Sequence, residues 1–85
     1  MAYRVELRRN AQRELDALRA DYRERVSAAI ESLCEDPRPP GVKKLKGDMG
    51  WRIRVSEYRV LYSIWDKERL VMVEGVARRT THTYD

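Results

Sequence analysis

Residues 51–65 read Trp51-Arg52-Ile53-Arg54-Val55-Ser56-Glu57-Tyr58-Arg59-Val60-Leu61-Tyr62-Ser63-Ile64-Trp65. In the first five positions apolar and basic residues alternate with a period of two, which predicts a strand with one buried face. The polar pair Ser56-Glu57 predicts a short turn, and the aromatic and β-branched residues that follow predict a second strand up to Trp65. After a turn at 66–68, we expect a third strand from Arg69 to Ala77, with Gly75 at a bulge or close approach. These segments predict an antiparallel meander.

The residues before the prolines predict one more strand and two helices. Apolar and charged residues alternate over residues 3–8, as in a strand with one buried face. Residues 10–18 carry the apolar spacing of a short amphipathic helix, with Asn10 as its N-cap. A second amphipathic helix is expected from Asp21, which forms a capping-box pattern with Glu24. Its apolar stripe consists of Tyr22, Val26, Ala29, Ile30 and Leu33.

Three prolines between residues 37 and 40 end the second helix, because proline and the residue before it disfavour helical backbone. Residues 42–50 are expected to form a basic loop. The resulting order is β-α-α-β-β-β, which predicts a single α+β domain over residues 1–85. In this fold a helical hairpin covers one face of an antiparallel sheet and leaves the other face open to solvent.

The net charge of +4 is concentrated in the second half of the chain. Residues 41–85 contain 10 Lys/Arg and 6 Asp/Glu, whereas the charges of residues 1–40 balance. A basic surface indicates a phosphate-bearing or acidic partner, with a merely solvated surface as the alternative. A single cysteine excludes an internal disulfide, and no apolar run is long enough for a signal peptide or a membrane helix. We therefore expect a cytoplasmic protein without membrane contact.

The candidate site is a cluster of arginines on the open face of the sheet. Arg52 and Arg54 project from one face of their strand, and a meander brings Arg59 and Arg79 close to them. Guanidinium groups on one surface match a phosphodiester backbone, although they can also cover apolar surface on a solvated sheet. One histidine and one cysteine give no metal-ligand cluster, so we expect no metal and no cofactor.

Two residues near the end of the sequence add aromatic and titratable groups. Tyr84 can stack on an unpaired base, and His82, the single histidine, is a possible general acid or base. The alternative for both is a side chain that is simply exposed. Lys43, Lys44 and Lys46 supply further positive charge just before the first strand of the meander.

Three segments together resemble toxins of the RelE/ParE superfamily. The run 36–47 resembles that family's connector from helix to strand, and residues 51–62 resemble its central hairpin. The ending Val76-Ala77-Arg78-Arg79 with a later Tyr84 is similar to its C-terminal signature. The resemblance extends from Tyr3 to Tyr84 and implies the RelE-like microbial RNase fold.

The resemblance implies an mRNA interferase that enters the ribosomal A site and cuts mRNA without a metal ion, the 2′-hydroxyl attacking the adjacent phosphate. By position it assigns catalytic roles to Arg52, Arg54, Arg59, Arg79 and Tyr84. It assigns RNA or ribosome contacts to Lys43, Lys44, Lys46 and Arg78. The implied partners are a cognate RelB-like antitoxin, the ribosome with its ribosomal RNA, and mRNA.

Two other functions are compatible with the resemblance. A ParE-like toxin inhibits DNA gyrase by protein contact and lacks the RNA-cleaving residues. A catalytically weak relative binds its antitoxin and does little else. RelE enzymes can carry lysines where this chain has Arg52 and Arg54, and arginine, unlike lysine, keeps its proton. Tyr84 or His82 would then have to serve as the base, or the rate of cleavage would be low.

Overall fold

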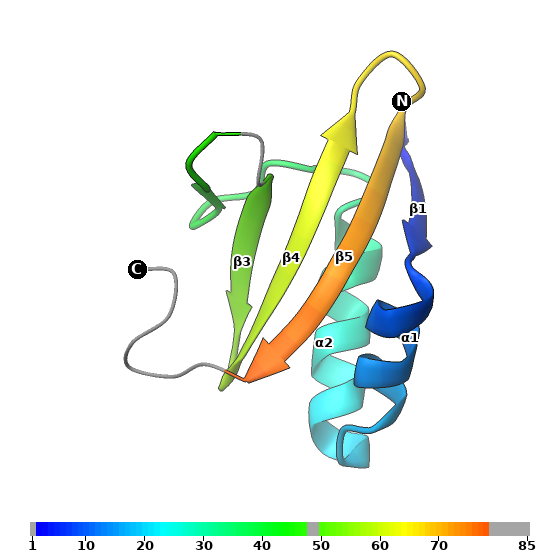
Figure 1. Cartoon of the computed structure of the whole chain (residues 1–85), viewed down its shortest axis with the longest axis vertical. Helices are drawn as coiled ribbons and strands as arrows, with labels where there is room; N and C mark the ends of the chain where they lie inside the picture. The colour runs from blue at the N-terminus through cyan, green and yellow to red at the C-terminus, as the bar shows by residue number, and fades with distance from the viewer. Residues whose placement is uncertain (1, 48–49, 79–85) are drawn as a thin grey trace.

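Five strands and two helices make up the described part of the chain, residues 2–47 and 50–78, in this computed structural model. One sheet has the strand order β1-β5-β4-β3-β2, and both helices pack on one side of it (Figure 1). The α+β class predicted from the sequence is confirmed, and the element order agrees with the prediction except for the additional short strand β2. The elements are β1 Arg4–Leu7, α1 Arg9–Asp16, α2 Ala20–Ser32, β2 Lys43–Lys44, β3 Trp51–Val55, β4 Tyr58–Trp65 and β5 Leu70–Arg78.

The predicted meander forms the centre of the sheet, with β3 antiparallel to β4 and β4 antiparallel to β5. The sheet is nevertheless mixed, because β1 pairs with β5 in parallel. The two helices carry the chain from β1 at one edge of the sheet to β2 at the other edge, and the meander then brings β5 back beside β1. The expected loop over residues 42–50 contains the two-residue strand β2, which pairs with the start of β3.

Gly75 lies at a bulge, as its position in the strand predicted. Leu61 of β4 faces Gly75, and Tyr62 faces Val73, so Glu74 is an extra residue of β5. Strand β1 ends where Leu7 faces Val73, and side chains of α1 then contact the backbone of β5. Asn10 Nδ2 donates to the Glu74 carbonyl at 2.9 Å. The Val76 amide donates to Glu14 Oε1 at 2.9 Å, which ties helix to strand.

The predicted helix caps are wrong at both helices. Helix α1 begins at Arg9, and its N-cap residue, Arg8, makes no side-chain cap bond. Asn10 lies inside the first turn, where its side chain donates to the carbonyl of Glu74 on β5. Helix α2 begins at Ala20, so Asp21 lies inside its first turn. There Asp21 pairs with Arg19 at 2.9 Å instead of forming a capping box.

The core lies between the helices and the sheet, and the predicted helical stripes supply it. The buried helical residues are Val26 and Ile30 of α2, Leu33 directly after α2, and Ala11 and Leu15 of α1. The sheet contributes Ile53, Val60, Tyr62, Val71, Val73 and Val76. The buried Tyr62 hydroxyl donates to the Pro37 carbonyl at 2.8 Å. Burial raises the pKa of this phenol well above its usual range, so it remains a donor. The bond fixes the chain just after α2 to the central strand.

Gly50, directly before β3, has room for no side chain. Its φ is +93°, and a Cβ there would lie 2.5 Å from the carbonyl oxygen of Tyr62 on β4. Gly47 also has a positive φ, +63°, but nothing lies within 4 Å of a Cβ at that position. A side chain at Gly50 would therefore be opposed by both the backbone conformation and a steric clash, whereas a side chain at Gly47 would be opposed by the backbone conformation alone.

We expect Gly50→Ala to lower the free energy of unfolding by about 3 kcal/mol, because strained backbone and a clash with a central strand add. Gly47→Ala serves as the control and is expected to cost about 1 kcal/mol, for the left-handed backbone alone. Urea unfolding followed by circular dichroism measures both. Equal losses in the two variants would contradict the role given to the contact with Tyr62.

Candidate nucleic-acid interface

Basic side chains from three neighbouring strands share the sheet face that points away from the helices. Lys43 of β2 faces Arg52 of β3, and Arg54 of β3 faces Arg59 of β4. Directly opposed residues point to the same side of a sheet, with Cβ atoms about 4.5–5.5 Å apart. The alternation on β3 predicted this, since Ile53 lies on the other side, in the core. We call Lys43, Arg52, Arg54 and Arg59 the arginine face.

The arginine face is less open than the sequence indicated. Lys43 and Arg54 are exposed, but Arg52 is only 3% exposed and Arg59 only 1%. Neither arginine lies on an edge strand, since β4 is the central strand and β3 is flanked by β4 and β2. Each of the three arginines has an interaction partner within the molecule, as a buried charge requires. A phosphate arriving from solvent would therefore meet Lys43 and Arg54 first.

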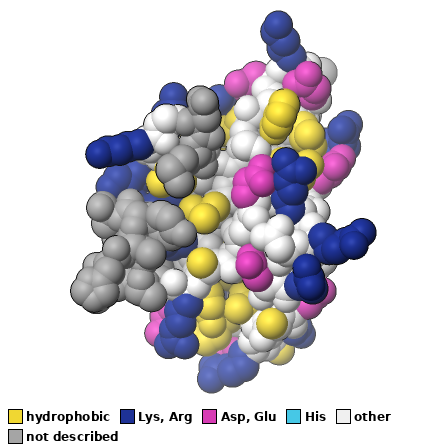
Figure 2. All heavy atoms as spheres, in the orientation of Figure 1, with side chains coloured by type: hydrophobic (Ala, Val, Ile, Leu, Met, Phe, Trp, Pro, Cys, Tyr) yellow, Lys and Arg dark blue, Asp and Glu magenta, His cyan; other side chains and the backbone are white. Residues whose placement is uncertain are grey.

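Apolar side chains share the rest of this sheet face with polar and charged ones, among them Arg4 and Glu6 of β1, which face Leu70 and Met72. Leu61 lies across from Arg52, and the pair Ser63–Met72 and the pair Trp65–Leu70 continue along β4 and β5. Leu61, Leu70 and Met72 are half-buried, while Trp65 is 48% exposed. In the view of Figure 2, hydrophobic side chains lie among Lys, Arg, Asp and Glu instead of forming one continuous patch. The face is thus basic over β2, β3 and the start of β4, and carries mixed apolar, polar and charged side chains over the rest of β4, β5 and β1.

Other predicted contact residues lie away from the arginine face. Lys44 faces Trp51 on the opposite side of the sheet, and Lys46 is exposed in the loop after β2. Arg78 faces Tyr58, whose ring contacts Tyr22 of α2, so Arg78 is on the helix side. Arg78 also forms a 3.6 Å ion pair with Glu57. The predicted residues Arg79, His82 and Tyr84 lie outside the described residues.

Sequence reasoning missed a cluster around Arg38 and Trp51. Arg38, in the connector after α2, makes two hydrogen bonds to Asp66, at 3.0 and 3.3 Å, and its guanidinium lies 5.0 Å from the centre of the Trp51 ring. The Tyr3 hydroxyl donates to the same carboxylate at 2.6 Å. The Arg38 guanidinium, followed by this hydroxyl, lowers the pKa of Asp66. Residues so distant in sequence give no local signal of such a contact.

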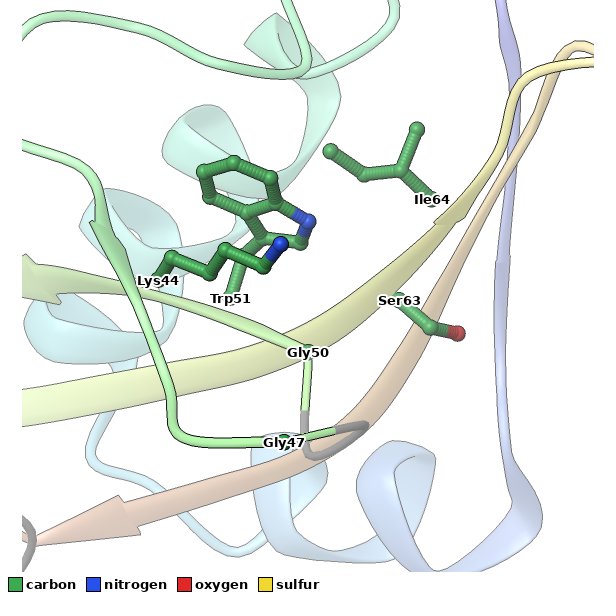
Figure 3. A pocket seen from close by; sticks show the side chains of 6 residues that line it. All are labelled: Lys44, Gly47, Gly50, Trp51, Ser63 and Ile64. Carbon is green, nitrogen blue, oxygen red and sulfur yellow. The ribbon is translucent and has the colours of Figure 1, made fainter.

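Beside Trp51 is a pocket, drawn in Figure 3. Lys44, Trp51, Ser63 and Ile64 line it together with two glycines, and the Lys44 ammonium lies 5.7 Å from the centre of the Trp51 ring. Among residues 2–47 and 50–78, no group of three His, Cys, Asp or Glu side chains is placed to hold a metal ion. Neither helix of that part of the chain is long and apolar enough to cross a membrane.

The comparisons with known proteins agree on one group of toxins. Residues 5–82 match the family described as ParE toxin of the type II toxin-antitoxin system parDE. A Methanocaldococcus jannaschii protein that carries the name toxin RelE1 is 30% identical over 84 residues, covering 93% of this chain and 92% of that protein.

Solved RelE structures share the fold over nearly the whole chain. RelE in the archaeal RelE–RelB complex from Pyrococcus horikoshii superposes with a TM-score of 0.83, at 26% identity, over 95% of this chain and 99% of that chain. The isolated Escherichia coli RelE toxin gives a TM-score of 0.80, at 26% identity, over 98% and 92% of the two chains.

The Asp66 contacts predict a pH dependence of stability. The folded-state pKa of Asp66 lies below its unfolded value of about 3.9. The contribution of ionised Asp66 to the free energy of unfolding is therefore fully present above that value and is lost as the pH falls through the folded-state pKa. We expect Asp66→Asn to lower the melting temperature at pH 7 and to differ less from the unmutated protein near pH 2. Thermal unfolding at both pH values measures this. A difference that does not change with pH would contradict an electrostatic role.

Proposed function

Because this chain belongs to the RelE/ParE superfamily of type II toxin–antitoxin toxins, we propose that it is a ribosome-dependent endoribonuclease that cleaves mRNA in the A site. The proposed activity takes place in the cytoplasm, where the ribosomes are located. The observation that carries it is the opposition of Arg54 to Arg59, with Arg52 and Lys43 beside them. Like charges directly opposed on a sheet destabilise it. A fold that keeps them at this cost fits a site for polyanion.

The arginine face supplies what metal-independent cleavage requires at the phosphate. When the 2′-hydroxyl loses its proton and attacks, negative charge accumulates on the non-bridging oxygens, and fixed cations stabilise that charge. The bond between phosphorus and the 5′-oxygen then breaks, and the leaving 5′-oxygen takes up a proton. Arg54 and Lys43 contact the phosphate from solvent in this scheme, and Arg52 and Arg59 add positive charge from below. Since arginine does not give up its proton at neutral pH, none of the three arginines acts as the base.

The proton transfers are proposed for residues at the end of the chain. Tyr84 stacks on the substrate base or activates the 2′-hydroxyl, and His82 is a further acid or base. Arg79 is proposed as a catalytic arginine that stabilises the transition state. The positions of these residues in the family resemblance support these roles.

The proposed inhibitor is a cognate RelB-like antitoxin. The Pyrococcus horikoshii relative forms a complex with RelB, and the mixed surface of this chain suits such a partner. An acidic amphipathic helix would place carboxylates against Lys43 and Arg54 and apolar side chains against Trp65 and Leu70. Binding there would exclude mRNA from the same face.

A ParE-like gyrase inhibitor is the second candidate, favoured by the description of the matching family. A catalytically weak antitoxin-binding relative is the third, favoured by arginines at Arg52 and Arg54. A gyrase supercoiling assay separates the second candidate from the others. Inhibition of supercoiling with intact mRNA would replace the present proposal.

Arg54→Ala is the variant that tests the arginine face, because Arg54 is exposed and its loss leaves the core intact. We expect ribosome-dependent cuts in a reconstituted translation reaction, mapped by primer extension, to slow by about 10²–10³-fold. Arg13→Ala removes an equal charge from the exposed surface of α1 and should cleave normally. Unreduced cleavage by Arg54→Ala would defeat the assignment.

Arg79→Ala is expected to reduce cleavage strongly while its circular dichroism spectrum and melting temperature stay unchanged. The physical reason is the loss of one guanidinium at the developing phosphate charge. The same translation reaction provides the measurement. Cleavage at the unmutated rate would remove Arg79 from the site.

Tyr84→Phe separates chemistry from stacking, because it keeps the ring and removes the hydroxyl. If the hydroxyl transfers a proton, we expect the cleavage rate to fall by about 10²-fold or more. Full activity of Tyr84→Phe would limit the role of Tyr84 to stacking by its ring. The variant His82→Gln would then test His82 as the acid or base.

A further inference from the structure

The pocket beside Trp51 lies at a notch in the sheet. The last pair between β3 and β4 joins Trp51 to Tyr62, and β4 continues without β3 as its neighbour from Ser63 to Trp65. Ser63 and Ile64 form the wall on that side, and the Trp51 ring and Lys44 form the other (Figure 3). The pocket has a volume of about 230 Å³ and is open on one side. That is below the roughly 300–1,000 Å³ of pockets for drug-sized ligands, so it suits a single flat group.

The Trp51 ring is held in place by contacts on several sides. Arg38 lies over it at 5.0 Å and is itself held by Asp66. Trp51 is half-buried, so one part of the indole packs on the core while another part remains accessible. The exposed Lys44 places its ammonium 5.7 Å from the same ring. An accessible aromatic ring with an exposed cation beside it is the combination that holds a nucleotide by its base and its phosphate.

We propose that the notch beside Trp51 is a second nucleotide subsite, in which an unpaired RNA base stacks on the indole and Lys44 holds the adjoining phosphate. The aromatic surface favours RNA over an acidic peptide as occupant, since an indole ring stacks on a nucleic-acid base and not on a carboxylate. The proposal rests on the proposed function only in naming RNA as the ligand.

The notch is separate from the arginine face. Trp51 and Arg52 are neighbours on β3, so they point to opposite sides of the sheet. Strand β2 links the two sides at the edge, because Lys43 faces Arg52 and Lys44 faces Trp51. An RNA strand that follows this edge would place one phosphate at Lys43 and another at Lys44, and so meet both surfaces. The subsite would orient RNA outside the place of cleavage.

Tryptophan fluorescence reports directly on the notch. The chain has two tryptophans, so Trp65→Phe leaves Trp51 as the single emitter. The probe is a short single-stranded 2′-O-methyl oligoribonucleotide, which lacks the attacking hydroxyl and therefore cannot be cut. We expect the emission of Trp51 to be quenched as the probe is added. In the reciprocal Trp51→Phe protein, Trp65 emission should stay unchanged.

Affinity measurements with the same probe test the two parts of the subsite. Trp51→Ala should weaken binding by roughly 5- to 100-fold, the effect of losing one stacked base. Lys44→Ala should reduce the slope of log K against log salt by about 0.7, the effect of losing one phosphate contact on a single strand. Arg13→Ala removes the same charge from α1 and should leave the Trp51 quenching unchanged. Circular dichroism of each variant controls for unfolding.

The outcomes distinguish this proposal from the proposed function. Quenching of Trp51 by the probe without any mRNA cleavage would support the subsite and reject the nuclease. Cleavage of mRNA with unchanged Trp51 emission, and equal affinities of Lys44→Ala and Arg13→Ala, would overturn the subsite alone. Quenching by a purified antitoxin but not by the RNA probe would also overturn it and identify a protein as the occupant.

Discussion

The pairing register between β3 and β4 is the constraint on which both the core and the arginine face depend. The two-residue turn at Ser56 and Glu57 joins Val55 to Tyr58 and so fixes Arg54 opposite Arg59. The same register places Ile53 opposite Val60 in the core. Because side chains alternate along a strand, a slip by one residue would turn arginines toward the helices and valines toward solvent. Folding and the candidate site therefore select the same register.

This register buries charged side chains, which lowers the free energy of unfolding unless other interactions offset the loss of hydration. Two guanidinium groups, on Arg52 and Arg59, are almost completely buried. Burial of charge is unfavourable unless partners compensate for lost water. Arg52 and Arg59 each have an interaction partner within the molecule, and on the other side of the same strands Val60 and Tyr62 are fully buried against the helices. A small core thus supports a charged face that does not itself favour folding, an arrangement expected where function sets the sequence.

How much the sequence could predict follows from the range of each interaction. Alternation and apolar stripes are local, and they correctly predicted the meander, both helices and the common face of Arg52 and Arg54. The caps at Asn10 and Asp21 were mispredicted, because the first side chain bonds Glu74, 64 positions away, and the second pairs with Arg19. The near-complete burial of Arg52 and Arg59 was not predicted, because alternation along a strand shows to which side a side chain points and not how deeply it is buried. Arg38 and Trp51 meet only in the folded chain.

The two-residue strand β2 shows why the edge of the sheet matters to the function of this toxin. A strand this short contributes little pairing energy, yet it directs Lys43 to one side of the sheet and Lys44 to the other. A protein helix laid across the arginine face would meet Lys43 and leave Lys44 beside Trp51. An extended RNA strand can instead bend around the edge and use both lysines. This edge would then distinguish the two proposed partners by shape instead of by charge, since both would be acidic and only an RNA strand is thin and flexible enough to follow the edge.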